Sequence, residues 1–312
     1  MTTNALPLPG EPDLRGELRL SEPLARHTSW RVGGPADRFY RPADLADLCV
    51  FLSRLPPDEP VFWLGLGSNL LVRDGGLRGT VIATQGALQG LTLSALTTLR
   101  VEAGVPCAKV ARYAAAQHLT GAEFLAGIPG VMGGALAMNA GAWGGDTWSL
   151  VTKVETVDRR GVWRRRPPTD YVIAYRQVRG PAEEGFVAAH LRLQPGDGAA
   201  ARRRIRELLA RRALTQPLGQ PSCGSVFRNP PGDHAARLIE AAGLKGHRLG
   251  AAAVSTQHAN FIINTGGASA AELEALIHQV ADTVARVHGV RLIPEVRIVG
   301  EYRDAATTAQ AG

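Results

Sequence analysis

The chain has 312 residues, 45% of them hydrophobic, which suffices for about two domains of roughly 100–200 residues, each with its own core. The net charge of +7 leaves nucleic acids and anionic small molecules open as partners. Three cysteines without a C-x-x-C pair argue against a disulfide framework or a zinc site, and residues 1–20 lack a secretory signal pattern, so we expect a cytoplasmic protein with reduced thiols.

The first zone, residues 28–84, reads as a small α/β unit. Short β-rich runs at 61–64, 70–72 and 81–83 surround a turn that reads Gly65-Leu66-Gly67-Ser68-Asn69, and a helix over 45–55 ends at two prolines. Leu70 replaces the third glycine of a dinucleotide fingerprint and the residues after it look extended, which disfavours a Rossmann site. The amides of the turn predict an anion-binding loop instead.

The second zone adds strands at 99–103, 150–158 and 185–193, a helix over 109–118, and a glycine run. Seven glycines lie within residues 127–145. The run is shorter than the roughly 20 apolar residues of a membrane span and too apolar for a linker. Glycines at 130–134 would let the backbone approach a ligand closely. This turn and the turn at 65–69 would then bind one diphosphate from two sides. The alternative is that these glycines serve packing alone.

Arginine supplies most of the positive charge, in two clusters. One surrounds Gly161 in a predicted hairpin over 159–166. The other lies on a helix after Ala200, where Ile205, Leu208 and Leu209 recur at helical spacing and leave the arginines on the opposite side. We interpret this side as a solvated face, while a basic surface would also attract an anionic nucleotide substrate.

The third zone mixes helices and strands. Asp233 is a candidate cap for a helix over 234–242. Ser269 and Glu272 form a capping box for a helix whose apolar stripe continues to Gly289. A final strand pair, 290–293 and 295–299, is interrupted by a proline, and residues 304–312 read as a disordered tail.

Several of these motifs, in the same order, resemble those of the UDP-N-acetylenolpyruvoylglucosamine reductase (MurB) family. The similar segments are residues 27–34, 65–72, 127–142, 175–176, 221–230, 235–240, 258–261 and 294–297. Only 49 positions lead from Arg176 to Ser225, which leaves no room for the extra tyrosine-bearing lobe of some members, so the chain looks like the shorter form.

The resemblance implies an α+β fold with a two-subdomain FAD-binding unit of the vanillyl-alcohol-oxidase (PCMH-like) type and a C-terminal substrate-binding domain. We expect a flexible segment at 1–20, FAD-binding subdomains at 21–85 and 86–199, and a substrate domain at 200–303 whose last strand returns to the active site. The implied FAD-binding residues are Gly65, Gly67, Ser68, Asn69, Leu70, Gly130, Gly133, Gly134 and Asn139. No metal is expected.

The resemblance also implies a catalytic set of Arg176, Ser225 and Glu295. Reduction of an enol ether conjugated to a carboxylate needs a hydride, a proton and stabilisation of negative charge. Ser225 would deliver the proton, and Arg176 with a protonated Glu295 would stabilise the charge. Taken singly, each of the three has a structural alternative. Ser225 would form a turn, Arg176 would belong to a surface ion pair, and Glu295 would be a charge at a strand edge.

The implied substrate-binding residues are Tyr175, Arg228, Asn229, His258 and Arg297. Period-two alternation places Glu295 and Arg297 on one face of a strand, so Arg297 is a candidate ligand of the substrate carboxylate. Arg228 stands where the family usually has lysine, and Cys223 replaces a small residue and is interpreted as packing. His258 either contacts substrate or lies in a core.

The sequence therefore predicts an NADPH-dependent flavoenzyme that reduces UDP-N-acetylglucosamine enolpyruvate to UDP-N-acetylmuramate, acting as a monomer without nucleic-acid or membrane partners. One alternative is another FAD oxidoreductase of the same cofactor fold. A second is a basic nucleic-acid-binding or scaffold protein, which would be unusual with only 5% aromatic residues and no helix-turn-helix or zinc signature.

Overall fold

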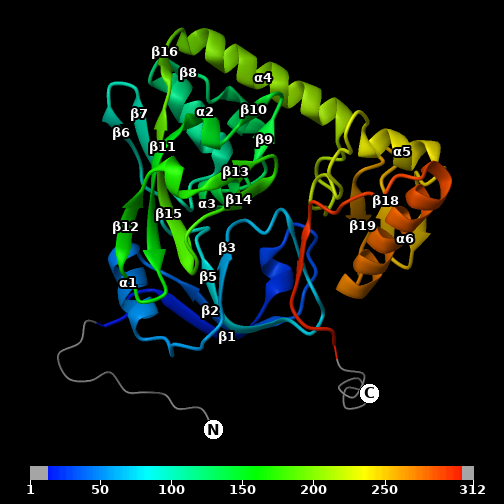
Figure 1. Ribbon diagram of the computed structural model, residues 1–312, viewed down its shortest axis with the longest axis horizontal. Helices are drawn as coiled ribbons and strands as arrows, with labels where there is room; N and C mark the ends of the chain where they lie inside the picture. The colour runs from blue at the N-terminus through cyan, green and yellow to red at the C-terminus, as the bar shows by residue number, and fades with distance from the viewer. Residues whose placement is uncertain (1–12, 304–312) are drawn as a thin grey trace.

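The structure, a computed structural model, describes residues 13–303, and its N-terminal unit is a four-stranded sheet with the order β1-β2-β5-β3 (Figure 1). β1 and β2 are antiparallel, whereas β5 lies parallel to both β2 and β3. Tyr40 and Phe51 stack with ring centroids 3.7 Å apart, which packs the helix α1 on this sheet. The elements are β1 (Glu17–Pro23), β2 (Pro35–Arg41), α1 (Leu45–Ser53), β3 (Val61–Leu64) and β5 (Leu77–Ala83).

The N-terminal strand begins earlier than we expected. Residues 17–20, which we assigned to a flexible segment, belong to β1 and pair with β2. The apolar side chains of this stretch, Leu18 and Leu20, are 50% and 60% exposed, so the strand lacks the buried alternation that identifies a strand in sequence. The rest of that segment, 1–12, and the predicted tail at 304–312 lie outside the described residues.

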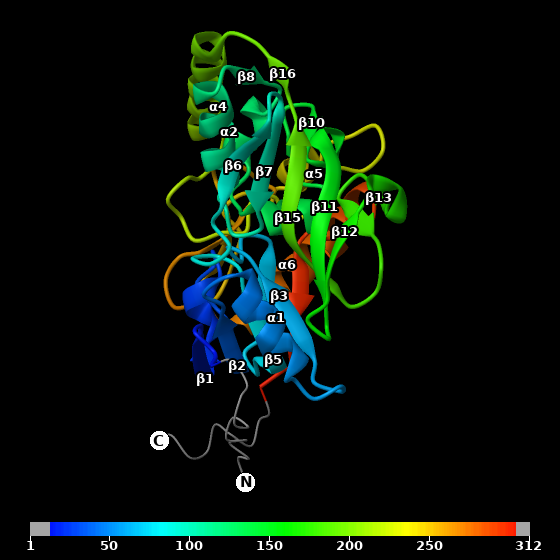
Figure 2. The same ribbon diagram turned by 90° about the vertical axis from the view of Figure 1, so that its left-hand side faces the viewer.

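The second unit is a five-stranded antiparallel sheet with the order β12-β11-β15-β7-β6, whose strands Figure 2 shows side by side. Leu99 and Val101 of β7 pack with Val110 and Ala114 of α2, and Ile205 joins α4 to the same core. The elements are β6 (Leu91–Ala95), β7 (Thr98–Glu102), α2 (Cys107–Ala116), α3 (Met132–Ala137), β11 (Val151–Asp158), β12 (Trp163–Arg166), β15 (Glu184–Arg192) and α4 (Gly198–Thr215).

Short ribbons and 3-10 turns connect these elements. The ribbons pair β8 (Leu119–Thr120) with β16 (Gln194–Pro195), β9 (Gly141–Ala142) with β10 (Gly145–Asp146), and β13 (Val172–Ala174) with β14 (Gln177–Arg179). The 3-10 turns are Leu24–His27, Glu123–Gly127, Trp148–Leu150 and Pro168–Asp170.

The third unit packs two helices on a three-stranded sheet with the order β17-β18-β19. Its longer helix begins at a capping box, because the Ser269 hydroxyl accepts from the Glu272 amide and the Glu272 carboxylate accepts from the Ser269 amide. The helix ends at Gly289, whose φ is +68°. The elements are α5 (Ala235–Ala241), β17 (Arg248–Leu249), β18 (Ala252–Val254), β19 (Ile262–Asn264) and α6 (Ala270–His288).

The C-terminal strand leaves the third unit and pairs with the N-terminal one. β20 (Arg297–Val299) lies parallel to β4 (Leu70–Val72), and the red segment of Figure 1 follows this return. The predicted strand pair at 290–299 is therefore wrong, since only these last residues form a strand. Pro294 has no amide hydrogen to donate, and the Glu295 amide donates to the Val226 carbonyl instead of a neighbouring strand.

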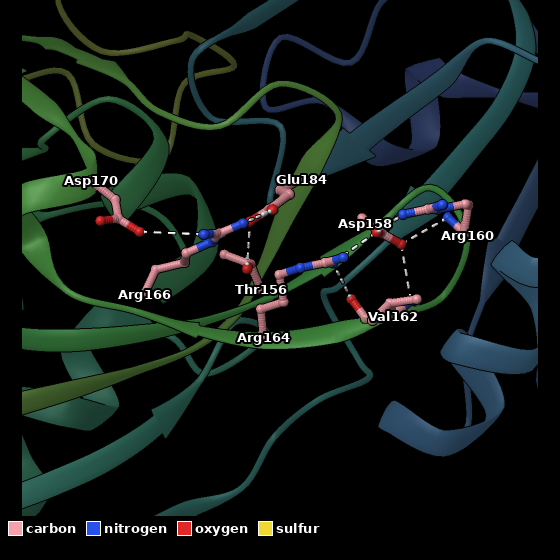
Figure 3. Close-up of polar contacts among 8 residues, drawn as sticks. All are labelled: Thr156, Asp158, Arg160, Val162, Arg164, Arg166, Asp170 and Glu184. Carbon is pink, nitrogen blue, oxygen red and sulfur yellow. Dashed lines mark hydrogen bonds and ion pairs between the residues drawn. The ribbon is translucent and has the colours of Figure 1, made fainter.

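The arginines near the 159–166 hairpin are largely neutralised by neighbouring carboxylates (Figure 3). Arg164 lies 2.7 Å from Asp158, and Arg166 lies 2.5 Å from Glu184. On α4, by contrast, most arginines are exposed, as expected for a solvated face. Most arginines of this hairpin are therefore engaged in ion pairs within the second unit.

Some features are missing from residues 13–303. None of the helices there is both long and apolar enough to cross a bilayer. Within the same residues, no group of three or more His, Cys, Asp or Glu side chains is arranged to hold a metal ion. The cysteines Cys49, Cys107 and Cys223 are all free thiols.

Candidate active site

Two glycine turns, one from the N-terminal unit and one from the second unit, face each other. A Cβ atom placed on Gly130 would lie 3.4 Å from the Ser68 hydroxyl oxygen. Gly67 has a φ of +66°, and a Cβ there would come 2.1 Å from the His27 carbonyl oxygen, so this position requires glycine. The turns therefore approach each other through atoms close to the backbone.

The glycines at 133 and 134 have different surroundings. The amides of Met132 and Gly133 donate to the Val105 and Ala103 carbonyls at 2.9 and 2.8 Å. A Cβ on Gly133 would lie 3.0 Å from the Ala103 Cβ, whereas a Cβ on Gly134 would meet nothing within 4 Å. Gly133 thus packs against the chain, and Gly134 faces open space.

That open space belongs to a cavity of about 260 Å³ between the N-terminal and second units. Its lining includes Gly65, Gly134, Gly185 and, as its cationic side chain, Arg297. A second cavity, of about 290 Å³, is lined by residues 127–129 and 140–143 of the same glycine run, together with Ser68 and Asn69. A long ligand lying along the glycine run would reach both cavities.

The second cavity also brings Arg176, Ser225 and Glu295 together, although they come from three distant parts of the chain. Arg176 occupies the turn of the β13–β14 hairpin with a φ of +55°, a conformation that costs a non-glycine residue about 1–3 kcal/mol. Its Nε lies 3.0 Å from a Glu295 carboxylate oxygen, and its Nη2 donates to the Gly141 carbonyl at 2.8 Å. These contacts fix the guanidinium in the cavity.

The backbone just after Ser225 is held by Asn260, a buried residue for which no sequence pattern indicated a role of its own. Its side chain accepts from the Phe227 amide at 2.9 Å and donates to the Phe227 carbonyl at 2.8 Å, just after Ser225. Glu295 is tied to the turn 65–69, because the Asn69 side chain donates to its carbonyl at 3.1 Å. Only the motif 258–261 around Asn260 could have signalled this role.

Burial raises the pKa of Glu295 above its ordinary value, and the neighbouring Arg176 and Arg228 oppose the shift. This favours the protonated form that a hydrogen-bond donor to a substrate anion requires. Burial also raises the pKa of the Cys223 thiol, which lines the same cavity and thus stays uncharged.

The predicted substrate residues do not all lie together. Tyr175, 60% exposed, and Asn229 line a larger neighbouring cavity of about 980 Å³, and the Asn229 side chain also accepts from the first amide of α5. Arg228 donates to the Arg176 carbonyl at 3.3 Å. His258 lies against the Phe261 ring at 4.7 Å, and its Nδ1 has no hydrogen-bond partner among residues 13–303.

Arg297 does not share a face with Glu295, so that expectation is wrong. Period-two alternation applies only within a strand, and Glu295 precedes the first residue of β20. Glu295 lines the cavity that holds Ser225, whereas Arg297 lines the cavity beside Gly134.

Two of the predicted cofactor residues have structural surroundings. Leu70 is buried within β4. Asn139, buried with a φ of +45°, accepts from the Trp148 amide at 3.0 Å and so holds the glycine run to the following turn.

Comparison with known proteins gives concordant matches. Residues 36–165 match a family model described as "FAD binding domain", and residues 216–299 match "UDP-N-acetylenolpyruvoylglucosamine reductase, C-terminal domain". The reductase of that name from Alkalilimnicola ehrlichii is 68% identical over 92% of this chain and 96% of its own length, and that from Methylococcus capsulatus is 62% identical over 92% and 94%. The crystal structure of the Thermus caldophilus enzyme matches with a TM-score of 0.78 and 32% identity, covering 91% of this chain and 98% of that one.

Proposed function

The chain belongs to the UDP-N-acetylenolpyruvoylglucosamine reductase family of FAD-dependent oxidoreductases, and we propose that Arg176, Ser225 and Glu295 carry out its reaction. The reaction reduces the enolpyruvyl group of UDP-N-acetylglucosamine enolpyruvate to give UDP-N-acetylmuramate, with NADPH as the source of the hydride. The observation that supports the assignment is that these three residues line one cavity, which continues along the glycine run.

The cavities fit FAD. Gly134 presents open space where a side chain would obstruct a ligand, and the turn at 65–69 faces it from the other unit. We propose that Gly65, Gly67, Ser68, Asn69, Gly130 and Gly134 hold the cofactor. When bound, FAD supplies the hydride that NADPH has donated. The flavin ring would lie at the end of the glycine run that borders Ser225.

Arg176 and Glu295 bind and stabilise the carboxylate end of the substrate. As the hydride reaches the alkene, negative charge spreads onto that carboxylate, and a fixed cation and a carboxylic acid lower its energy. The Arg176 guanidinium is fixed by the Gly141 carbonyl, and the Glu295 backbone is fixed by Val226 and Asn69. Because both are positioned before substrate arrives, little reorganisation remains for the reaction itself.

Ser225 donates the proton that completes the reduction. An alcohol is a weak acid, but the enolate formed in this reaction is a strong base, and a hydroxyl at hydrogen-bond distance transfers its proton directly. The two peptide hydrogen bonds from Asn260 hold the segment just after Ser225. Ser225 therefore lines the cavity from a constrained backbone.

The test is spectroscopic. Purified protein should be yellow, its flavin absorbance should disappear on adding NADPH without oxygen, and it should return on adding the enolpyruvyl substrate. Protein that is colourless and cannot be reconstituted with FAD would refute the proposed function.

The catalytic assignment has its own test. Ser225→Ala should leave flavin reduction by NADPH near the wild-type rate and slow reoxidation by the substrate by about 10²–10⁴-fold. The matched control is Ser94→Ala on β6, whose hydroxyl bonds only within its own hairpin, and which should change neither half-reaction. Equal losses in both half-reactions of Ser225→Ala would favour another FAD oxidoreductase of the same cofactor fold.

We further propose that residues 21–85 and 86–199 hold the cofactor and that residues 200–303 bind substrate. Because α4 packs in the core of the second unit, the third unit itself begins after this helix. We also propose that the protein works as a monomer in the cytoplasm, a compartment that suits its free thiols. Gel filtration with light scattering would test the first of these two points, and fractionation of cells would test the second.

A further inference from the structure

The backbone of Arg297 is fixed beside the cofactor turn. Arg297 is the first residue of β20 and pairs in register with Leu70 of β4. Its amide donates to the Asn69 carbonyl at 3.2 Å. The backbone of Arg297 is thus positioned by the same turn, 65–69, that faces the glycine run.

Arg297 and Phe62 both line the cavity beside Gly134, and the Arg297 guanidinium carbon lies over the Phe62 ring, 6.0 Å from its centroid. Within residues 13–303 Arg297 forms no ion pair. The other charged residue of the lining is Glu184, and its carboxylate already bonds Arg166 at 2.5 Å and the Thr156 hydroxyl at 2.7 Å. Arg297, which is exposed to solvent, is therefore the charged residue of this lining without an ion-pair partner among residues 13–303.

The backbone beside this cavity supplies fewer donors than its glycine content suggests. The amides of Met132 and Gly133 already donate to the Val105 and Ala103 carbonyls. A diphosphate bound along Gly134 would need charge from elsewhere, and an arginine provides planar, charge-assisted hydrogen bonds to phosphate oxygens.

The substrate carboxylate is served by different residues. Arg176 lies with Glu295 and Ser225 in the other cavity, and Arg228 bonds the Arg176 carbonyl next to it. Arg297 lines neither that cavity nor the large one that contains Tyr175. Arg297 therefore lies outside the group of residues that lines the cavity of Ser225 and Glu295.

We propose that Arg297 binds the diphosphate of FAD and takes no part in holding the substrate carboxylate. The proposal rests on the proposed function, because it requires FAD to lie along the glycine run. It assigns the C-terminal strand a second task, since the same strand that follows Glu295 would close one side of the cofactor site.

The experiment titrates flavin-free full-length protein with FAD, FMN and riboflavin and follows flavin fluorescence. Arg297→Gln should raise the Kd for FAD by about 10- to 100-fold, raise the Kd for FMN less, and leave the Kd for riboflavin unchanged, because riboflavin has no phosphate. Arg297→Lys, which retains the charge without the planar fork, should fall between wild type and Arg297→Gln. The control is Arg291→Gln. Arg291 is exposed, lies six positions before β20 and lines none of the three cavities described above, so this variant should bind all flavins like wild type.

Two results would overturn the proposal. An FAD Kd within twofold of wild type, with a KM for the enolpyruvyl substrate raised tenfold, would make Arg297 a substrate residue. Equal weakening of FAD, FMN and riboflavin would show an effect on the flavin ring or on the fold, and urea unfolding of each variant would identify the latter. Wild-type protein that bound no flavin at all would refute the proposed function itself.

Discussion

The two adjacent glycines of α3 offer a test that separates cofactor binding from packing. A Cβ on Gly134 would enter empty space, whereas a Cβ on Gly133 would lie 3.0 Å from the Ala103 Cβ and 3.3 Å from its carbonyl oxygen. Gly133→Ala and Gly134→Ala therefore add the same methyl group to neighbouring positions of one helix, and their different surroundings determine the result.

The stability changes should have opposite signs in flavin-free protein. Gly134→Ala should stabilise the protein by about 0.5–1 kcal/mol, because alanine loses less backbone entropy than glycine in a helix. Gly133→Ala gains the same stability from the lower backbone entropy cost, but forcing a methyl group against Ala103 costs about 1–3 kcal/mol. We therefore expect the free energy of unfolding of Gly133→Ala to fall by about 1 kcal/mol.

Cofactor binding should follow the reverse order. If FAD lies against Gly134, the added methyl group occupies its space, and we expect the FAD Kd of Gly134→Ala to rise at least tenfold, or about 1.4 kcal/mol. Gly133→Ala, once folded, should bind FAD within a few-fold of wild type, since its methyl group points at Ala103.

Urea unfolding of flavin-free protein and fluorescence titration with FAD measure the two effects separately. A Gly134→Ala variant that is stabilised and binds FAD like wild type would refute the reasoning, because the cavity beside Gly134 would then not hold the cofactor. A loss of stability in Gly134→Ala would show instead that this position is packed.

Three further results are expected. Glu155, paired with Arg100 and His190 in the second unit, has its pKa lowered to about 2 by these partners despite burial, so Glu155→Gln should destabilise the protein by about 3 kcal/mol at pH 7. The stabilisation by this carboxylate is complete above its ordinary pKa and is lost as the pH falls toward 2. In urea unfolding, the free energy of unfolding of Glu155→Gln should therefore differ less from wild type at about pH 3 than at about pH 7. A difference that does not change with pH would contradict the assignment. Because burial raises the pKa of Glu295, flavin reoxidation by substrate should slow as the pH rises and Glu295 loses its proton. Stopped-flow measurements on Glu295→Gln should show no such decline. Arg176→Lys keeps the charge but loses the contacts of the planar guanidinium, so the same reoxidation step should slow by about 10²-fold while flavin reduction by NADPH is retained, and an unchanged rate would remove Arg176 from the charge-stabilising role.

Local signals in the sequence predicted the elements whose ends are determined locally. The helix over 270–288 was expected from Ser269, Glu272 and Gly289, and all three act at its ends as expected, because capping depends on residues a few positions apart. β1 was missed, because its leucines face solvent and its partner strand determines its existence. The same limit explains why the alternation argument failed for Glu295 and Arg297.

The grouping of the site residues could be expected only from the family resemblance. Asn69 and Glu295 are 226 positions apart, and the hydrogen bond between them exists because β20 returns to pair with β4. No periodicity or spacing in the sequence encodes such a return. The resemblance ordered the motifs along the chain, but it did not separate Gly133 from Gly134 or place Arg297 in a different cavity from Glu295.

This long-range connection has a consequence for how the site works. Asn69 lies in the turn that faces the glycine run, and its side chain donates to the carbonyl of Glu295. The strand that begins two residues later, at Arg297, pairs with the strand that begins at Leu70. The turn 65–69 is therefore connected to the proposed acid Glu295 by one hydrogen bond and by a parallel strand pair. Glu295 in turn lies 3.0 Å from the Nε of Arg176, whose backbone is left-handed and whose Nη2 donates to the Gly141 carbonyl. The cofactor turn, the acid and the guanidinium thus form one connected set, and the strain at Arg176 is stable because the other two members are fixed by pairing elsewhere in the fold.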